Sequence, residues 1–244
     1  MVAWILSFVL LVIVLYIIKD SVVFLLGGSG TGLFIVGTYW LIGDFVTWLI
    51  VINTIFLSDG ESSRKTNKIQ NRIIKRRNDC LKAFKYLKLN KPEFYNFPDN
   101  KMDTVPFLDI VKIIESKIMK FKPDTIITHF ENCLNIDHRI TFKAVVTACR
   151  PLKNISVKNI LSFEVPSSTD WALFSKKSFN PNFYVDITGE INKKIASLKF
   201  YNSEMKKFPH SRSKKNIKAL AQIRGAASGV KYAEAFYLSR CVIR

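Results

Sequence analysis

Apolar residues in the middle of the chain alternate between two patterns. Residues 45–57 and 125–128 are short, continuous runs rich in β-branched side chains, which is typical of strands buried on both faces. Residues 65–87 and 105–121 instead carry apolar side chains at helical spacing. The same criteria predict further strands at 157–165 and 184–188 and further helices at 139–150, 190–207 and 216–224. Alternating strands and helices indicate an α/β domain over residues 44–244, a Rossmann-like three-layer fold with helices on both faces of a parallel sheet.

The first 43 residues follow neither pattern. Residues 2–18 form an unbroken apolar run followed by Lys19 and Asp20, close to the shortest length that crosses a bilayer. Because this run lacks the features of a cleaved signal peptide, we expect a membrane anchor with the basic remainder of the chain in the cytoplasm. The alternative is that part of the run is the first, buried strand of the sheet.

Residues 21–43 are also uncharged, and the sequence Gly-Gly-Ser-Gly-Thr-Gly interrupts them. This second run could return across the bilayer as the other arm of a hairpin. It could equally be a strand, a glycine loop and a buried helix that begin the sheet. The glycine spacing matches neither the dinucleotide-binding fingerprint nor the phosphate-binding P-loop, so a phosphate site there is the weaker hypothesis.

Basic charge is concentrated after residue 57. The formal net charge is +18, yet residues 1–57 contain one lysine and two aspartates. This asymmetry favours an anionic membrane surface or another phosphate-bearing partner, although a merely solvated surface is the simpler alternative. The sequence shows no nucleic-acid-binding signature, so we expect no nucleic-acid partner. The four cysteines lack metal-binding spacing and indicate free thiols.

Candidate chemistry lies between the strand at 125–128 and the helix that follows it. A polar loop there contains His129, Asp137 and His138, at the end of a strand where open α/β sheets bind ligands. A neutral imidazole can bind zinc, and a second imidazole kept off the metal can stabilise an oxyanion. Asp137 can orient a histidine. Their spacing alone also fits ordinary loop histidines.

The residues Thr128, His129, Asn135, Asp137 and His138 resemble the second motif of the PIG-L, or LmbE-like, family of zinc-dependent sugar N-deacetylases. Further resembling blocks follow the family order at residues 57–64, 76–79, 94–99, 160–171, 179–183, 208–213, 224–225 and 232–236. The resemblance implies that His138 binds the metal, that His129 stabilises the tetrahedral intermediate, and that Asp137 is the neighbouring acid. It also implies a third strand ending near Asp99 and a sugar held by Glu61, Arg64, Asp99, His210 and Arg212.

One family motif is missing. The first motif, Ala-His-Pro-Asp-Asp-Glu, supplies the other two metal ligands and the general base, but this chain has no histidine before His129. Three hypotheses follow. The chain is a zinc-dependent deacetylase of a lipid- or nucleotide-linked N-acetyl sugar, a non-hydrolysing relative that binds a glycan or another partner, or a product whose sequence upstream of Gly43 is altered.

Overall fold

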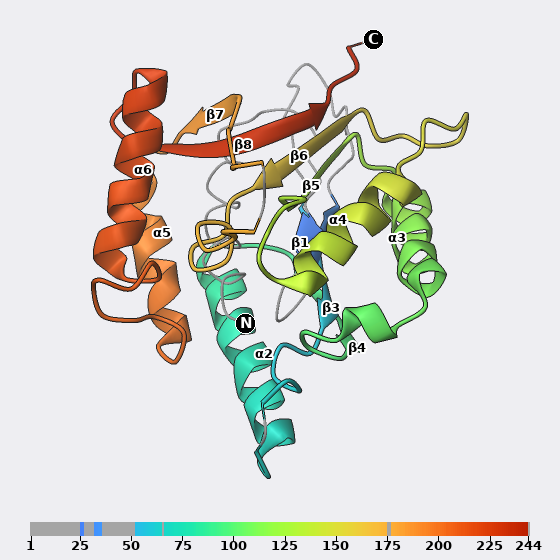
Figure 1. The fold of residues 1–244 in the computed structure, drawn as a ribbon, viewed down its shortest axis with the longest axis horizontal. Helices are drawn as coiled ribbons and strands as arrows, with labels where there is room; N and C mark the ends of the chain where they lie inside the picture. Colours follow the sequence, from blue (N-terminus) through green and yellow to red (C-terminus); the bar gives the residue numbers. More distant parts are fainter. Residues whose placement is uncertain (1–24, 27–31, 36–51, 65, 175–176, 244) are drawn as a thin grey trace, which may run out of the picture.

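The computed structural model describes residues 25–26, 32–35, 52–64, 66–174 and 177–243. Its strands form two four-stranded sheets, in the orders β1-β2-β3-β4 and β5-β6-β8-β7 (Figure 1). The strands are β1 (Leu25–Leu26), β2 (Gly32–Ile35), β3 (Asn53–Ser58), β4 (Glu93–Phe97), β5 (Thr125–His129), β6 (Asn159–Phe163), β7 (Phe183–Asp186) and β8 (Ala233–Arg240). β1 and β2 both contact β5, so the two sheets adjoin.

The strand directions are mixed. β3 pairs in parallel with β4, and β5 pairs in parallel with β6, as the alternation of elements predicts. β8, however, runs antiparallel to both β6 and β7, and β2 runs antiparallel to β3. The α/β class is therefore confirmed, whereas the prediction of a wholly parallel sheet is corrected. β8 enters between β6 and β7 from the opposite end of the sheet, after the helical segment at residues 191–228, so an intervening helix does not by itself make neighbouring strands parallel.

Helices cover the strands on two sides. The helices are α2 (Ile69–Tyr86), α3 (Phe107–Phe121), α4 (Ile136–Ala148), α5 (Ile191–Ser197) and α6 (Lys214–Ser228). Figure 1 shows α3 and α4 on one side of the strands and α2, α5 and α6 on the other. The helix predicted at 190–207 is shorter than expected, because α5 passes into a 3₁₀ turn, η2 (Leu198–Tyr201).

α4 begins three residues earlier than its apolar pattern predicts. The side chain of Asn135 accepts a hydrogen bond from the backbone N–H of Asp137 at 2.8 Å, which caps the helix. Asp137 and His138 therefore lie in the first turn of α4, and the expected loop position of both residues is corrected. This turn places the helix start beside the carboxyl end of β5.

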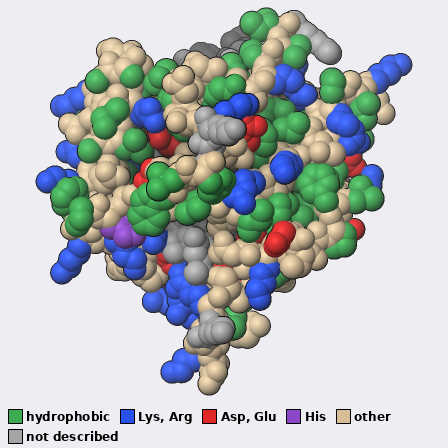
Figure 2. Space-filling view, in the orientation of Figure 1, with side chains coloured by type: hydrophobic (Ala, Val, Ile, Leu, Met, Phe, Trp, Pro, Cys, Tyr) green, Lys and Arg blue, Asp and Glu red, His purple; other side chains and the backbone are tan. Residues whose placement is uncertain are grey.

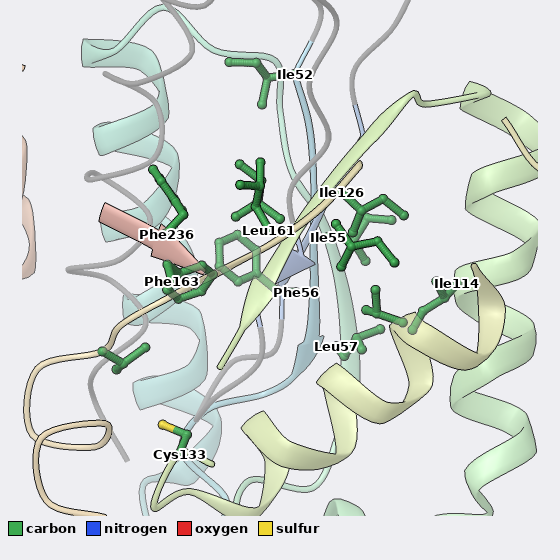
Figure 3. Packing of buried hydrophobic residues seen from close by; sticks show 14 of the residues in the cluster. Ile52, Ile55, Phe56, Leu57, Ile114, Ile126, Cys133, Leu161, Phe163 and Phe236 are labelled. Carbon is green, nitrogen blue, oxygen red and sulfur yellow. The ribbon is translucent and has the colours of Figure 1, made fainter. Parts of the chain in front are cut away.

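The core lies between the strands and the two helix layers. Ile55, Phe56 and Leu57 of β3 are almost fully buried, and so are Ile126 of β5 and Leu161 of β6 (Figure 3). The rings of Phe56 and Phe94 stack with centroids 5.2 Å apart, which joins β3 to β4. Burial of consecutive residues on both faces explains why these strands read as continuous apolar runs.

The proposed membrane anchor at residues 2–18 lies outside the described residues. On either side of residues 27–31, the structure has the strands β1 and β2. Within the described ranges, no helix combines the length and hydrophobicity that a bilayer crossing requires. Lysine and arginine side chains are spread over the face shown in Figure 2, whereas acidic side chains are few there.

Candidate active site

Two histidines form a buried stack at the carboxyl end of β5. His129 is the last residue of this strand, and His138 is in the first turn of α4. Their ring centroids are 3.7 Å apart with an angle of 9° between the ring planes. Both side chains are buried almost completely, and Phe163 of β6 contacts the His129 ring at 4.7 Å. The predicted pair is thus brought together at the strand edge where it was expected.

Both imidazoles are neutral near pH 7. Burial lowers the pKa of His129 well below its ordinary value, and the neighbouring His138 lowers it further. Burial likewise lowers the pKa of His138. Among the residues that the structure describes, no hydrogen-bond partner reaches either ring nitrogen of His129 or the Nε2 atom of His138. Unsatisfied buried polar groups are costly, so three such nitrogens in one place indicate a site built for a ligand.

Cys133 is a site residue that the sequence did not reveal, because its spacing matches no cysteine motif. Its Sγ atom lies 2.9 Å from Nδ1 of His138 and 2.9 Å from Oγ of Ser168. Burial raises the pKa of the Cys133 thiol, which therefore stays protonated. The thiol fixes the orientation of the His138 ring and leaves Nε2 as its unpartnered nitrogen.

Asp137 connects α4 to the turn after β4. Its two carboxylate oxygens accept hydrogen bonds from the backbone N–H groups of Asn100 at 2.7 Å and Met102 at 3.0 Å. Burial raises the pKa of this carboxyl group from 3.8 to about 7. The hydrogen bonds of Asp137 thus position the helix that carries His138, and neither goes to a histidine.

Asp99 is fully buried just beyond β4, near this turn. The Ser63 hydroxyl donates to one carboxylate oxygen of Asp99, and the Asp99 backbone N–H donates to Oγ of Ser62 at 2.8 Å. The other carboxylate oxygen, Oδ1, has no hydrogen-bond partner in the described part of the chain. Burial raises the pKa of Asp99. An unpartnered acceptor is suited to a ligand hydroxyl, which fits the expected sugar contact.

Glu61 and Arg212 belong to a buried ionic cluster with Glu204 and Arg76. Glu61 contacts Arg76 at 2.8 Å, and Glu204 contacts Arg76 at 2.5 Å and Arg212 at 3.3 Å. Partly exposed Arg64 lies 3.5 Å from Glu61. The expected sugar-binding residues Glu61, Arg64 and Arg212 are therefore held in ion pairs that join the loop after β3, α2 and the segment after η2.

His210 lies apart from the histidine stack. Its ring packs on Trp171 with centroids 5.3 Å apart, and its Nδ1 atom accepts a hydrogen bond from the backbone N–H of Arg212 at 3.0 Å. Burial lowers the pKa of His210, and the positive charge of Arg212 lowers it further. The structure thus places His210 in a loop on the α6 side of the molecule.

The described residues do not fit a closed zinc site. Within the ranges that the structure describes, no three His, Cys, Asp or Glu side chains are grouped so that they could hold a metal ion. The lone pairs of imidazole nitrogens lie in the ring plane, so two parallel, stacked rings do not direct them at one point. At most one histidine of the pair can therefore donate well to a given ion, whereas a catalytic zinc typically takes three protein ligands.

Comparison with known proteins supports the fold and the family resemblance. The family model PIG-L, described as GlcNAc-PI de-N-acetylase, matches residues 48–149, which include β3 to α4 and both stacked histidines. The resemblance to the PIG-L family is confirmed. The resembling blocks from residue 160 onward lie outside this match, and no curated protein matches the chain.

Several solved structures share the fold at low sequence identity. The N,N'-diacetylchitobiose deacetylase of Pyrococcus horikoshii is 18% identical with a TM-score of 0.59, covering 76% of this chain and 72% of that one. The 4-carboxy-2-hydroxymuconate hydratase GalB of Pseudomonas putida KT2440 is 17% identical with a TM-score of 0.59, covering 78% and 84%. The zinc-inhibited form of teicoplanin deacetylase Orf2 is 16% identical with a TM-score of 0.53, covering 68% and 74%. Because these structures of similar fold include both deacetylases and a hydratase, the fold alone does not decide the reaction.

Proposed function

We propose that this chain is an N-deacetylase that removes the acetyl group from an N-acetylated sugar conjugate at the histidine stack. The observation that carries the proposal is the pair of buried, neutral imidazoles with three unpartnered nitrogens at the carboxyl end of β5. The names of the matching family and of the deacetylase from Pyrococcus horikoshii, both of which concern N-acetylated amino sugars, support this substrate class.

His129 would bind the oxygen of the acetamide. A neutral imidazole has one N–H donor, and none of the described residues forms a hydrogen bond with either nitrogen of His129. Donation to the acetamide oxygen stabilises the negative charge that develops there during amide hydrolysis. Because burial keeps the pKa of His129 low, the ring stays a neutral donor and is a weak base.

His138 would offer Nε2 as a metal donor, since Cys133 occupies its Nδ1 atom. Asp99 would accept a sugar hydroxyl at its unpartnered Oδ1 atom. Zinc is one expected cofactor by resemblance, but the described donor set is incomplete, so no catalytic step is assigned to it. The function of the described residues is to bind, orient and polarise the acetamide.

A second function is favoured by that incomplete donor set. A protein of this fold without a full metal site would bind an N-acetylated glycan and would not hydrolyse it. The same nitrogens that polarise an acetamide would then serve only to recognise it. The two functions make the same prediction for binding and opposite predictions for acetate release.

The test uses the purified full chain with N-acetylglucosamine conjugates. We expect acetate release that His138→Ala lowers at least about a hundredfold, and addition of a metal chelator tests separately whether a metal takes part. His210→Ala, which removes the histidine outside the stack, should lower release less than about tenfold. Glycan binding by calorimetry without acetate release or bound metal would favour the binding function, and absence of both binding and release would refute both functions.

A further inference from the structure

Two loops on the surface expose large apolar side chains next to each other. Trp171, Leu173 and Phe174 are exposed in the loop after β6, and Phe208 is exposed in the loop before α6. Trp171 packs on His210, with ring centroids 5.3 Å apart, so the two loops lie side by side. We call the four exposed side chains the apolar patch. Large apolar side chains that gather on a surface mark a contact with a partner or a membrane, whereas scattered ones are ordinary.

The backbone of both loops is hydrogen-bonded, so the fold itself holds the apolar patch in water. In the first loop, the Thr169 N–H donates to the Val165 carbonyl, and the Val165 N–H donates to Oγ1 of Thr169, both at 2.8 Å. In the second loop, the Lys206 N–H donates to the Arg212 carbonyl at 3.3 Å. A loop that is already ordered loses little conformational entropy on binding, and covering its apolar side chains is favourable.

Lysines surround the apolar patch. Residues 206–215 contain four lysines and one arginine and no acidic residue. Arg212 is paired with Glu204 at 3.3 Å, whereas the four lysines are exposed and form no ion pair with any described residue. The Nζ atom of Lys215 lies 4.5 Å from the centre of the Phe208 ring. In Figure 2, a histidine at the surface has hydrophobic and basic side chains beside it.

Charges next to the loop after β6 are closer to balance. Lys177 and Asp170 are both exposed and carry opposite charges. The guanidinium of Arg139 lies 5.2 Å from the centre of the Phe174 ring. The lysines of residues 206–215 therefore decide the sign of the charge around the apolar patch, and a positive surface attracts an anionic partner.

This composition fits a lipid bilayer better than a protein or a nucleic acid. Protein–protein interfaces are depleted in lysine, whereas lysines beside an inserted apolar group bind the anionic head groups of a membrane. Tryptophan is enriched at the boundary between membrane and water. Nucleic-acid bases stack on aromatic rings, so a fully aliphatic side chain such as Leu173, which is 93% exposed, would gain nothing from them.

We propose that the apolar patch and the lysines of residues 206–215 dock the protein on the surface of an anionic lipid bilayer. The four apolar side chains enter the head-group region, and the lysines bind the anionic head groups. This surface is distinct from the apolar run at residues 2–18 and acts without it. The proposal goes beyond the proposed function and does not depend on it.

Docking through this surface brings the histidine stack close to the bilayer. The first loop contacts the site directly, because Oγ of Ser168 lies 2.9 Å from Sγ of Cys133 and that Sγ atom contacts His138. Trp171 follows Ser168 by three residues. A docked protein therefore faces the bilayer with the side on which the loop after β6 meets the start of α4.

The first test is amide hydrogen exchange of the full chain with vesicles of phosphatidylcholine and phosphatidylserine, or of phosphatidylcholine alone. We expect exchange at residues 171–174 and 206–210 to slow with the anionic vesicles and to change less with the neutral ones. Exchange at residues 152–155, which precede the opposite end of β6, should stay unchanged. This measurement reads the two loops themselves, even where another part of the chain also binds lipid. Unchanged exchange in both loops would overturn the proposal.

The second test compares variants by co-sedimentation of the full chain with the anionic vesicles. We expect Leu173→Ala to lower the partition coefficient about tenfold, because it removes an inserted apolar side chain. Lys207→Ala should lower it about fivefold, and added salt should reduce this loss. Leu152→Ala and Lys153→Ala are the matched controls, because both residues are exposed at the opposite end of β6, and they should leave the partition coefficient unchanged.

The outcomes separate this proposal from the proposed function. Vesicle binding that depends on Leu173 and Lys207, without acetate release, would support the docking surface and refute hydrolysis. Acetate release without protection of either loop would refute the docking surface and leave hydrolysis in place. Equal losses in Leu173→Ala and Leu152→Ala would also count against it. Binding of single-stranded RNA through Trp171 and Phe208, with no effect of vesicles on the loops, would assign the surface to nucleic acid instead.

Discussion

The histidine stack and the ionic cluster at α2 are both buried and polar, but they differ in how their polar atoms are satisfied. In the cluster, Glu61 and Glu204 surround Arg76 with ion pairs of 2.8 and 2.5 Å. In the stack, three of the four imidazole nitrogens have no hydrogen bond to any residue in the described ranges. A polar group paired within the protein stabilises the fold, whereas one left unpaired lowers stability unless a ligand binds it. The comparison therefore assigns the cluster to structure and the stack to function.

Arg76→Leu gives the largest expected effect, because it removes the centre of the cluster and leaves two buried carboxylates short of a partner. We expect the free energy of unfolding to fall by about 3–5 kcal/mol, as for other broken buried ion pairs. Urea unfolding followed by circular dichroism measures this change. Arg72→Ala is the matched control, because Arg72 also contacts Glu61 at 2.8 Å but its side chain is 40% exposed. Arg72→Ala should lower the free energy of unfolding by less than about 1 kcal/mol. Equal falls in the free energy of unfolding for Arg76→Leu and Arg72→Ala would contradict the structural role of the buried cluster.

Asp137→Asn tests a residue that shares one property with each region. Its carboxyl group is hydrogen-bonded within the protein, as in the ionic cluster, but burial makes its ionisation unfavourable. Its pKa in the folded chain is about 7, above the ordinary 3.8, because of burial. The folded state therefore holds a proton that the unfolded state loses as pH rises from about 4, so this group's contribution to stability falls until about pH 7. The difference between the pKa values of Asp137 in the folded and unfolded states corresponds to about 4 kcal/mol in the free energy of unfolding.

The measurement for Asp137 is the free energy of unfolding between pH 5 and pH 8, compared between the unmodified chain and Asp137→Asn. The histidine stack acts in the opposite direction, because its lowered pKa values make stability fall as pH drops below about 6.5. Asp137→Asn leaves that contribution in place, so the difference between the two pH profiles isolates Asp137. A constant difference across this pH range would refute the raised pKa.

Cys133→Ala gives the smallest expected effect and probes how the stack is oriented. Loss of the thiol removes the partner of His138 Nδ1 and frees the ring to rotate. We expect acetate release, or glycan affinity if hydrolysis is absent, to fall about tenfold, as for other groups that orient a site histidine. Cys149→Ala is the control, because Cys149 is equally buried but lies at the far end of α4. Equal losses in both variants would point to a general packing defect.

The sequence located the histidine site only in part. The strand ending at His129 followed from its β-branched run, and the approach of His138 followed from the strand-to-helix order. The start of α4 was misplaced because a capping side chain, Asn135, extends the helix beyond its apolar pattern. Cys133 was missed because its role depends on contact with His138 and Ser168, the second of which is 35 residues away.

The sequence by itself determined the α/β class, the main elements between residues 53 and 148, and the histidine pair at a strand end. These features depend on periodicity and on neighbours within one strand-loop-helix unit, and such local patterns are visible in a linear chain. Only the tertiary structure decided that β8 runs antiparallel, that Glu204 pairs with Arg76 from 128 positions away, and that Arg224 pairs with Glu164 from 60 positions away. Those features arise from contacts between distant segments, and the distances and burial that set their energies exist only once the chain has folded.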